Sequence, residues 1–330
     1  MPLKPPPFAV QSISEATLTQ RTPAAHAAVL ARFKKMRTGG AFLPGSEQGT
    51  IVVPGFDGGA EWGGAGFDPD TGLIYINATE SAHIIKMIKQ APRTGTDTGR
   101  SLYLRECGAC HRPNLAGSPP EFPSLVDISK RRSEADITKL LHQGYGRMPS
   151  FARLGDNVLD AIRDFVYKGE NRTVQGKVNT AFDMKYRFDG YTRFLDPQGY
   201  PAIQPPWGSL NAINLNTGEF AWKVPLGEYP ELAAKGVPTT GTDNYGGPVI
   251  TAGGLLFIAA SSYDHKFRAF DKSTGKMLWE TSLPAAGNAT PATYEIDGRQ
   301  YVVVAAGGGK SFADHDAPSA SIYVAYALPK

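Results

Sequence analysis

Most of this chain consists of short apolar runs separated by glycine-containing turns, which is the pattern of β-strands. Such runs occupy residues 49–54, 255–260 and 321–328, and each is too short for a core helix. Thr-Gly and Asp-Gly turn signals recur between the runs, and the chain holds 37 glycines and 26 prolines. The pattern therefore predicts a mainly β fold.

A strand-turn-strand phrase occurs three times, at residues 67–77, 212–222 and 269–279. The last two copies share an Asp or Asn, a Thr-Gly pair and a closing tryptophan, Trp222 or Trp279, in the same register. A repeat period of roughly 50 residues is typical of a β-propeller, whose four-stranded blades bury their faces against neighbouring blades. We expect both tryptophans to dock one blade on the next.

Residues 91–170 lack this repeat and have helical periodicity instead. Helices are expected at 99–106, 133–142 and 156–168, the last capped by Asp156 and ended by Gly169. About 80 residues of helix inserted between strand repeats indicate a small all-α domain placed in a propeller loop.

Four segments follow from these patterns. Residues 1–42 are expected to form a proline-rich arm and a surface helix over residues 22–37. Residues 43–90 form a first blade segment, 91–170 the inserted helical domain, and 171–330 the remaining blades. At a period near 50, the β segments make about four blades.

The helical segment contains the strongest chemical motif, Cys107 and Cys110 followed by His111. Two thiols at this spacing can each add to a vinyl group of one haem, and the adjacent imidazole then becomes an axial iron ligand. A zinc half-site or a dithiol redox pair are the alternatives. These are the only two cysteines in the chain, so no second pair completes a four-sulfur zinc site. The motif predicts covalent haem c.

Met148, on a proline-containing loop downstream, is the predicted second axial ligand of the haem iron. His142, at the end of an amphipathic helix, is the rival ligand, although it equally suits a helix C-terminal dipole. A six-coordinate iron transfers electrons and does not bind oxygen.

Charge and hydropathy limit the possible partners and location. The net charge of +3, with mixed signs along the chain, gives no indication of nucleic-acid binding and supports at most a weakly basic rim for an acidic partner. No apolar run approaches the length of a membrane span, and the N-terminus has no apolar signal core. Because haem is normally attached outside the cytoplasm, we expect the chain to be a piece of a longer periplasmic or otherwise extracytoplasmic protein.

Several long phrases resemble the pyrroloquinoline quinone (PQQ)-dependent dehydrogenases of the glucose and alcohol dehydrogenase type. The resemblance covers nearly everything outside the helical insert, and the phrases occur in the family's order. They lie at residues 4–9, 58–64, 67–75, 241–248, 268–271, 283–291 and 301–308.

This resemblance implies an eight-bladed propeller that oxidises a sugar or alcohol with PQQ and calcium. Some family members carry a fused cytochrome domain, so it also implies that electrons pass from PQQ through the haem to a soluble cytochrome or respiratory acceptor. The chain resembles only the C-terminal half of that propeller. The half that supplies the calcium ligands and the acidic catalytic base has no counterpart here, so calcium is expected only in the complete enzyme and the catalytic residues are unknown.

The resemblance places Glu61, Trp62 and Asn244 on the PQQ side. Glu61 stands where many relatives have asparagine, and both a calcium contact and a tolerated substitution remain open. Trp62 is equally suited to docking one blade on another. Two other functions also remain open: a noncatalytic electron-transfer module, and a split enzyme in which a second polypeptide or a second copy completes the propeller.

Overall fold

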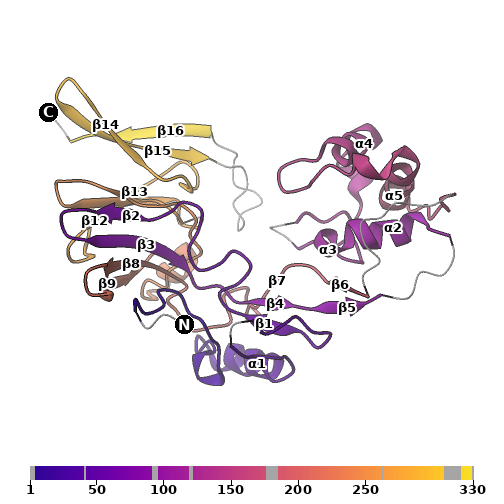
Figure 1. Cartoon of the computed structure of the whole chain (residues 1–330), viewed down its shortest axis with the longest axis horizontal. Coiled ribbons are helices and arrows are strands. Elements are labelled where there is room, and N and C mark those ends of the chain that lie inside the picture. The colour runs from indigo at the N-terminus through magenta and orange to yellow at the C-terminus, as the bar shows by residue number, and fades with distance from the viewer. Residues whose placement is uncertain are drawn as a thin grey trace. The chain divides into compact units, whose positions relative to one another are not determined.

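The computed structural model describes residues 4–40, 42–90, 96–118, 122–175, 185–261, 263–307 and 321–328. The chain divides into two compact units (Figure 1). The β unit comprises Met1–Leu43, Ile51–His83 and Arg193–Lys330, and the helical unit comprises Pro44–Thr50 and Ile84–Thr192. The short strands β1 (Thr50–Val52), β4 (His83–Ile85) and β7 (Thr192–Arg193) lie at the chain positions where this division falls.

Three antiparallel sheets form the β unit, and their strands follow one another in the orders β2-β3-β8-β9, β10-β11-β12-β13 and β14-β15-β16 (Figure 1). The predicted mainly β fold is confirmed. The strands are β2 (Gly66–Asp68), β3 (Leu73–Thr79), β8 (Gly208–Asn214), β9 (Glu219–Pro225), β10 (Val249–Ile250), β11 (Leu255–Ile258), β12 (Lys266–Asp271), β13 (Met277–Ser282), β14 (Ala292–Ile296), β15 (Arg299–Gly307) and β16 (Ser321–Tyr326).

The sequence repeat corresponds to a repeated strand register. Ala212 on β8 pairs with Trp222 on β9, and Ala269 on β12 pairs with Trp279 on β13. In both sheets the register shifts directly after the alanine, so a bulge occupies the same place. Two sheets of one repeating design are typical of propeller blades.

Each sheet buries its faces against the next one. Leu73, Leu210, Leu256 and Phe270 belong to one buried cluster that spans the first two sheets. The indole Nε1 of Trp222 donates to the carbonyl oxygen of Lys272 in the neighbouring sheet, at 3.0 Å. These contacts agree with the docking role predicted for this tryptophan.

The second tryptophan of the repeat makes the equivalent contact with the third sheet. The ring centroid of Trp279 lies 5.4 Å from that of Tyr326 on β16 in an edge-to-face arrangement. A separate buried cluster, which includes Phe267, Leu283 and Val302, fills the space between these two sheets. Each blade is therefore stabilised mainly by its neighbours.

The N-terminal helix is shorter than expected. Helix α1 (Pro23–Phe33) begins with Pro23, and the Thr22 hydroxyl accepts from the Ala25 amide at 3.1 Å. It ends four residues before Arg37, whose carbonyl oxygen accepts from the Ile51 amide at 2.9 Å. That bond holds the backbone out of the helix. The short helices η1 (Glu15–Thr17) and α6 (Pro230–Ala233) complete the helical segments described in the β unit.

The helical unit contains the three predicted helices and one short additional helix. They are α2 (Gly99–Glu106), α3 (Gly108–His111), α4 (Glu134–Gln143) and α5 (Asp156–Lys168). The helices η2 (Ile128–Lys130) and η3 (Ala152–Leu154) and the antiparallel strand pair of β5 (Met87–Lys89) and β6 (Tyr186–Phe188) accompany them. Residues 91–95, where the predicted domain begins, lie outside the described residues.

Within the helical unit, the local signals discussed for the ends of α4 and α5 agree with the structure in all but one place. Ser133 and Asp136 form a reciprocal capping box on α4, and Gly169 ends α5 with φ +75°. The expectation that Asp156 caps α5 is wrong. Gly155, with φ +80°, is the residue before the helix, and Asp156 is its first helical residue, where a carboxylate favours the helix dipole. Among the described residues, no helix is both long and apolar enough to cross a bilayer.

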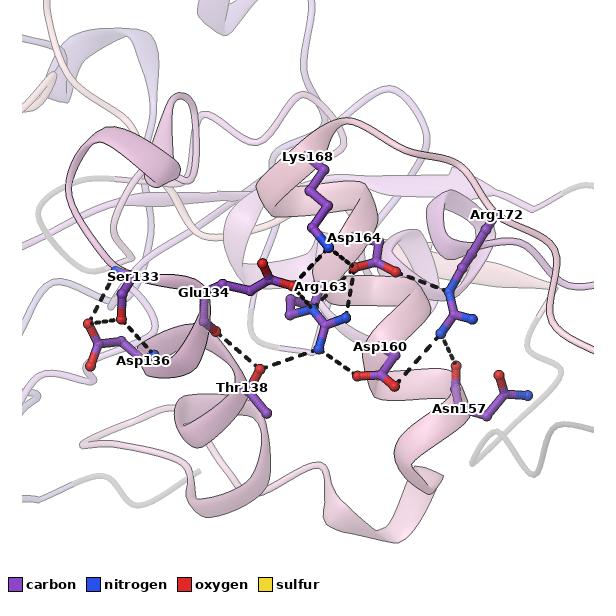
Figure 2. A network of polar contacts seen from close by, with 10 residues as sticks. All are labelled: Ser133, Glu134, Asp136, Thr138, Asn157, Asp160, Arg163, Asp164, Lys168 and Arg172. Atoms are coloured by element: carbon purple, nitrogen blue, oxygen red, sulfur yellow. Dashed lines mark hydrogen bonds and ion pairs between the residues drawn. The ribbon is translucent and has the colours of Figure 1, made fainter.

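An ion-pair network joins α4 to α5 (Figure 2). The guanidinium of Arg163 on α5 contacts Glu134 on α4 at 3.0 Å and Asp164 at 2.8 Å. Lys168 also reaches Glu134 and Asp164, at 2.8 and 3.2 Å. Because several partners share each charge, this network orients the start of α4 more firmly than an isolated surface pair would.

This network predicts a pH dependence of the helical unit's stability. Burial alone would raise the pKa of Asp164, but hydrogen bonds from Arg163 and Lys168 outweigh it and the pKa is lowered. A lowered folded-state pKa gives stability that is complete above the unfolded value of about 3.9 and is lost as the pH falls through the folded value. We expect Asp164→Asn to flatten the acid limb of the unfolding free energy against pH.

Thermal unfolding of the helical unit, followed by helical circular dichroism between about pH 2 and 6, measures this effect. Asp127→Asn is the control, because Asp127 is an exposed carboxylate whose contact with Lys130 is itself an exposed pair. An equal flattening by both variants would contradict a special role for Asp164.

Candidate functional site

The two cysteines lie where one helix stops and the next begins. Cys107 is the single residue between α2 and α3, and its amide donates to the Tyr103 carbonyl at 2.8 Å. The amide of Cys110 donates back to the Cys107 carbonyl at 3.1 Å, in a tight turn. Both cysteines are free, Cys107 being buried and Cys110 half-buried. This turn holds the two thiols on one short segment.

The thiols are neutral at physiological pH in this fold. Burial, with help from Glu106 and Cys110, raises the pKa of Cys107 to about 12, and burial also raises the pKa of Cys110. Zinc sites and reactive dithiols require thiolates and usually lower these pKa values. Among the described residues, no three His, Cys, Asp or Glu side chains gather as a metal site. With only two cysteines in the chain, the thiols cannot complete a four-sulfur zinc site, and the Cys-Cys-His spacing fits thioether bonds to haem.

His111 is oriented as an iron ligand would be. Its Nδ1 lies 3.0 Å from the carbonyl oxygen of Pro123, so a proton on Nδ1 is donated there and Nε2 keeps its lone pair. Burial lowers the pKa of His111, although the bond to Pro123 opposes this, and the ring stays neutral near pH 7. The sequence pattern alone did not single out Pro123.

Arg112, directly after the motif, fixes the loop around it. Its backbone has φ +62°. The guanidinium donates to the Gly117 carbonyl at 3.0 Å, the Ser118 hydroxyl at 2.9 Å, the Tyr191 carbonyl at 3.0 Å and the Thr192 hydroxyl at 2.6 Å. Sequence reasoning also missed this residue, because all four partners depend on the tertiary fold. Arg112 therefore ties two later segments of the chain, residues 117–118 and 191–192, to the end of the motif.

Met148 lies in a tight turn and packs on the same core as Cys107. The amide of Tyr145 donates to the Met148 carbonyl at 2.9 Å, and the amide of Met148 donates to the Tyr145 carbonyl at 3.0 Å. The rival, His142, has its Nε2 3.6 Å from a carboxylate oxygen of Asp156. Met148 is therefore the better candidate, and its coordination of iron stays a prediction.

Gly144 is required for the Met148 turn. It has φ +72°, and a Cβ there would overlap the Met148 carbonyl oxygen. We expect Gly144→Ala to destabilise the helical unit by roughly 2 to 3 kcal/mol, since backbone must move and the left-handed conformation is strained. Urea unfolding measures the loss.

Gly146→Ala is the matched control for this prediction. Gly146 also has a positive φ, +57°, but a methyl group added there would meet nothing within 4 Å. This variant should cost only about 1 kcal/mol of backbone strain. Equal losses in the two variants would show that the contact with Met148 is unimportant.

In the β unit, the loops that lead into the first strand of each sheet meet one another. The Thr290 hydroxyl donates to the Gly63 carbonyl at 2.9 Å and accepts from the Gly247 amide at 3.1 Å. A Cβ on Gly63 would overlap the Gly247 nitrogen, so glycine is needed for this approach. The repeat's glycine-rich phrases therefore converge on one site.

A cavity of about 330 Å³ lies at this site, and Trp62 forms one side of it. The indole is 72% exposed, so it presents an open aromatic face. Glu61 is half-buried in the same loop and does not line the cavity. The lining consists of Trp62, Asn288, Ala289, Ala305, Ala306, Gly307, Ser321, Ile322 and Tyr323.

This lining fits a planar quinone only in part. The indole can stack on a flat ring, and Asn288, Ser321 and Tyr323 offer hydrogen-bond donors. PQQ carries three carboxylates, and none of the lining residues that the structure describes is cationic. The described part of the cavity wall therefore does not neutralise those charges.

Asn244 is used by the fold itself. It is fully buried, and its side-chain oxygen accepts from Asn77 at 2.6 Å. Its side-chain nitrogen donates to the carbonyls of Ala78 and Thr242 at 2.9 and 3.0 Å. A quinone contact from this amide stays a prediction, and it would require some of these bonds to break.

Comparison with protein-family models gives two matches. The model described as glucose/ethanol/alcohol dehydrogenase, beta-propeller domain matches residues 1–109 and 138–302. The model described as cytochrome C oxidase, cbb3-type, subunit III matches residues 94–166, which contain the cysteine motif and Met148.

Curated relatives match over most of this chain. Quinoprotein glucose dehydrogenase of Escherichia coli (strain K12) is 32% identical over 90% of the chain and 29% of its own length. Quinate/shikimate dehydrogenase (quinone) of Acinetobacter baylyi is 28% identical over 98% of the chain and 32% of its own length. Glycerol dehydrogenase large subunit of Gluconobacter oxydans is 30% identical over 90% of the chain and 32% of its own length. The chain thus spans about a third of the length of these relatives.

Proposed function

Because this chain belongs to the glucose/ethanol/alcohol dehydrogenase β-propeller family, we propose that it is the electron-exit portion of a PQQ-dependent dehydrogenase. In this proposal, PQQ held in the β propeller would supply the oxidation of a sugar or alcohol. A covalent haem c in the helical unit would supply one-electron transfer to an external acceptor. The chain itself is proposed to contribute only part of the quinone site.

The hydrogen bond between His111 Nδ1 and the Pro123 carbonyl is the observation that carries the haem assignment. It leaves Nε2 as the only ring nitrogen able to bind a metal, directly after two neutral thiols. This bond suits any metal-binding histidine, and haem is favoured over zinc because the chain has only two cysteines and cannot complete a four-sulfur zinc site.

Each residue of the motif has a distinct proposed role. Haem supplies one-electron transfer when it is bound. Cys107 and Cys110 would hold the porphyrin edge through thioethers, and His111 and Met148 would bind the iron. A methionine and histidine ligand pair would raise the reduction potential, which favours acceptance of electrons from a reduced quinone.

In the β unit, Trp62 is proposed to stack on one face of PQQ. Glu61, half-buried beside it, is positioned to influence a nearby cation or a quinone oxygen. The cationic partners of PQQ, the calcium ligands and the catalytic base are proposed to lie in the propeller portion that the longer relatives contain. That portion would be supplied by the rest of the polypeptide, a second chain or a second copy.

The substrate is proposed to be a polyhydroxylated alcohol or sugar. The three relatives above are named for glucose, quinate or shikimate, and glycerol, all of which carry neighbouring hydroxyl groups. We place the protein outside the cytoplasm, because haem attachment at such a motif occurs there. A soluble cytochrome or a respiratory acceptor would receive the electrons.

A second candidate function is a noncatalytic electron-transfer module. The absence of any cation among the described residues that line the Trp62 cavity favours it. Binding of PQQ separates the two functions, because the module would keep its haem and bind no quinone.

Equilibrium dialysis of PQQ against the purified protein provides the test. The proposal expects binding that falls at least tenfold in Trp62→Ala and is unchanged in Phe67→Ala, an exposed aromatic on β2 that does not line the cavity. No binding by the wild-type chain would favour the module. Equal PQQ binding by wild type and Trp62→Ala would show that the quinone does not bind beside Trp62.

A further inference from the structure

The two units carry opposite net charges. The helical unit has 18 lysine and arginine residues against 13 aspartate and glutamate residues, a formal charge of +5. The β unit has 16 against 18, a formal charge of −2. The overall charge of +3 is therefore the sum of a basic helical unit and a slightly acidic β unit. A basic unit favours an acidic partner.

Much of the helical unit's charge is neutralised inside the unit. Arg105 pairs with Asp97, Arg153 pairs with Glu106 at 2.5 Å, and the network of Figure 2 pairs Arg163, Lys168 and Arg172 with Glu134, Asp160 and Asp164. Glu134, the acidic residue closest in sequence to the basic triplet at residues 130–132, is thus directed toward α5. The carboxylate of Glu134 pairs with Arg163 and Lys168 and does not neutralise the positive charges of residues 130–132.

The loop after Pro123 exposes this triplet beside an apolar side chain. Val126 is 49% exposed, and the Lys130 side chain is 75% exposed. Arg131 donates to the carbonyls of Ser124 and Val126, at 2.7 and 2.9 Å, and so holds the loop in shape. Lys130 contacts Asp127 at 3.0 Å in an exposed pair, which screens it only weakly.

The loop that carries Met148 has the same composition. Tyr145 is 80% exposed, and Arg147 is also exposed. The two backbone hydrogen bonds between Tyr145 and Met148 fix the turn, so Tyr145 is presented to solvent by an ordered loop. An exposed tyrosine beside an arginine is typical of protein interfaces.

Both loops are anchored on one core, through Leu125 in the first and Met148 in the second. In the proposed function, Pro123 in the first loop orients one axial ligand and the second loop supplies the other. The exposed residues of both loops are therefore a few residues from the ligands of one iron. Electron transfer is fastest where a partner approaches the metal most closely.

We propose that Val126, Lys130, Arg132, Tyr145 and Arg147 form an acceptor surface that binds the acidic face of a small redox protein. This inference rests on the proposed function. One electron passes from the ferrous haem iron to the oxidised metal centre of the acceptor, which is reduced, and no proton moves. Two exposed apolar side chains with a basic rim suit a transient protein complex and offer little area for insertion into a membrane.

Stopped-flow mixing of the reduced haem protein with ferricytochrome c tests the acceptor surface. Chemical reduction of the protein removes any dependence on PQQ or substrate. Two acceptors are compared, succinylated ferricytochrome c, which is acidic, and the unmodified basic protein. We expect the second-order rate constant to be at least tenfold higher with the acidic acceptor at about 10 mM salt, and this advantage to vanish near 0.5 M salt.

Charge reversal locates the surface on the molecule. Lys130→Glu with Arg132→Glu should lower the rate constant for the acidic acceptor about tenfold at low salt. The control, Lys235→Glu with Lys276→Glu, makes the same change in net charge at two exposed positions of the β unit and should change the rate less than twofold. Tyr145→Ser should lower the rate at both low and high salt, because it removes apolar contact area.

Three outcomes would overturn the proposal. Equal effects of the two double variants would mean that net charge acts without a local surface. Equal rate constants for the acidic and the basic acceptor at low salt would show that the surface has no preference for an acidic partner. Binding to phosphatidylglycerol vesicles that is lost in the Lys130 and Arg132 variant, with no preference for the acidic acceptor, would assign the surface to a membrane. A purified protein without covalent haem would overturn this inference together with the proposed function.

Discussion

Replacement of both Cys107 and Cys110 by alanine is expected to remove all covalently attached haem from the protein. These are the only cysteines in the chain, so no other thiol can form a thioether. Haem staining after denaturing electrophoresis, together with the intact mass, measures the loss. Each single variant should keep one thioether and therefore retain haem in smaller yield.

The β unit should survive this double substitution. Its sheets pack around their own buried clusters, and neither cluster contains a cysteine. The β signal in circular dichroism should therefore stay within error of the wild type, as it should in the control Arg100→Ala on α2. Covalent haem that persists in the double variant would show that the motif is not the attachment site.

Met148→Ala is expected to convert a low-spin haem spectrum to a high-spin or nitrogen-ligated one. Loss of the thioether should also lower the reduction potential by a sizeable part of the roughly 0.8 V that axial ligands span. Absorption spectroscopy and a redox titration measure the two effects. Met277→Ala, on β13 in the β unit, is the matched control and should leave both unchanged.

His142 decides how a negative result would be understood. Its Nε2 lies near Asp156, so it is expected to stay there when Met148 is removed. A wild-type-like spectrum in Met148→Ala that is lost in His142→Ala would make His142 the ligand. An unchanged spectrum in both variants would place the second ligand elsewhere.

The features predictable from sequence were those set by neighbouring residues. The Thr-Gly turns and their tryptophans indicated the strand repeat, because turn type and side-chain alternation are local properties. The helix ends at Ser133 and Gly169 were predictable for the same reason. The prediction of Asp156 as a cap was wrong because Gly155, which can take a positive φ, extends the preceding turn by one residue.

The features that escaped prediction depend on contacts far apart in the sequence. The C-terminus of α1 is set by the bond between Arg37 and Ile51, and the orientation of His111 by Pro123. The meeting of Gly63 with Gly247 and Thr290 joins three loops that no local pattern connects. Long-range pairing of this kind needs the tertiary structure.

The quinone side shows how far a resemblance can reach. It named Trp62 and Asn244 together, yet the structure exposes the indole and buries the amide among several backbone and side-chain partners. The described residues that line the cavity beside Trp62 also include none of the cations that a tricarboxylate needs. The segments that resemble the family, residues 58–64 and 241–248, therefore determine the shape of these loops as much as their chemistry.

Reduction of the haem by substrate tests most directly whether PQQ and haem act in one relay. Oxidised, haem-loaded protein is combined with the propeller portion proposed to supply the calcium ligands and the catalytic base, then mixed with PQQ, calcium and a panel of aldoses and polyols, and the haem absorption band is followed. We expect reduction that requires PQQ, substrate and that portion, and that is slowed in Trp62→Ala. No reduction by the complete mixture, in a sample whose haem responds normally to a chemical reductant, would contradict a relay from PQQ to this haem.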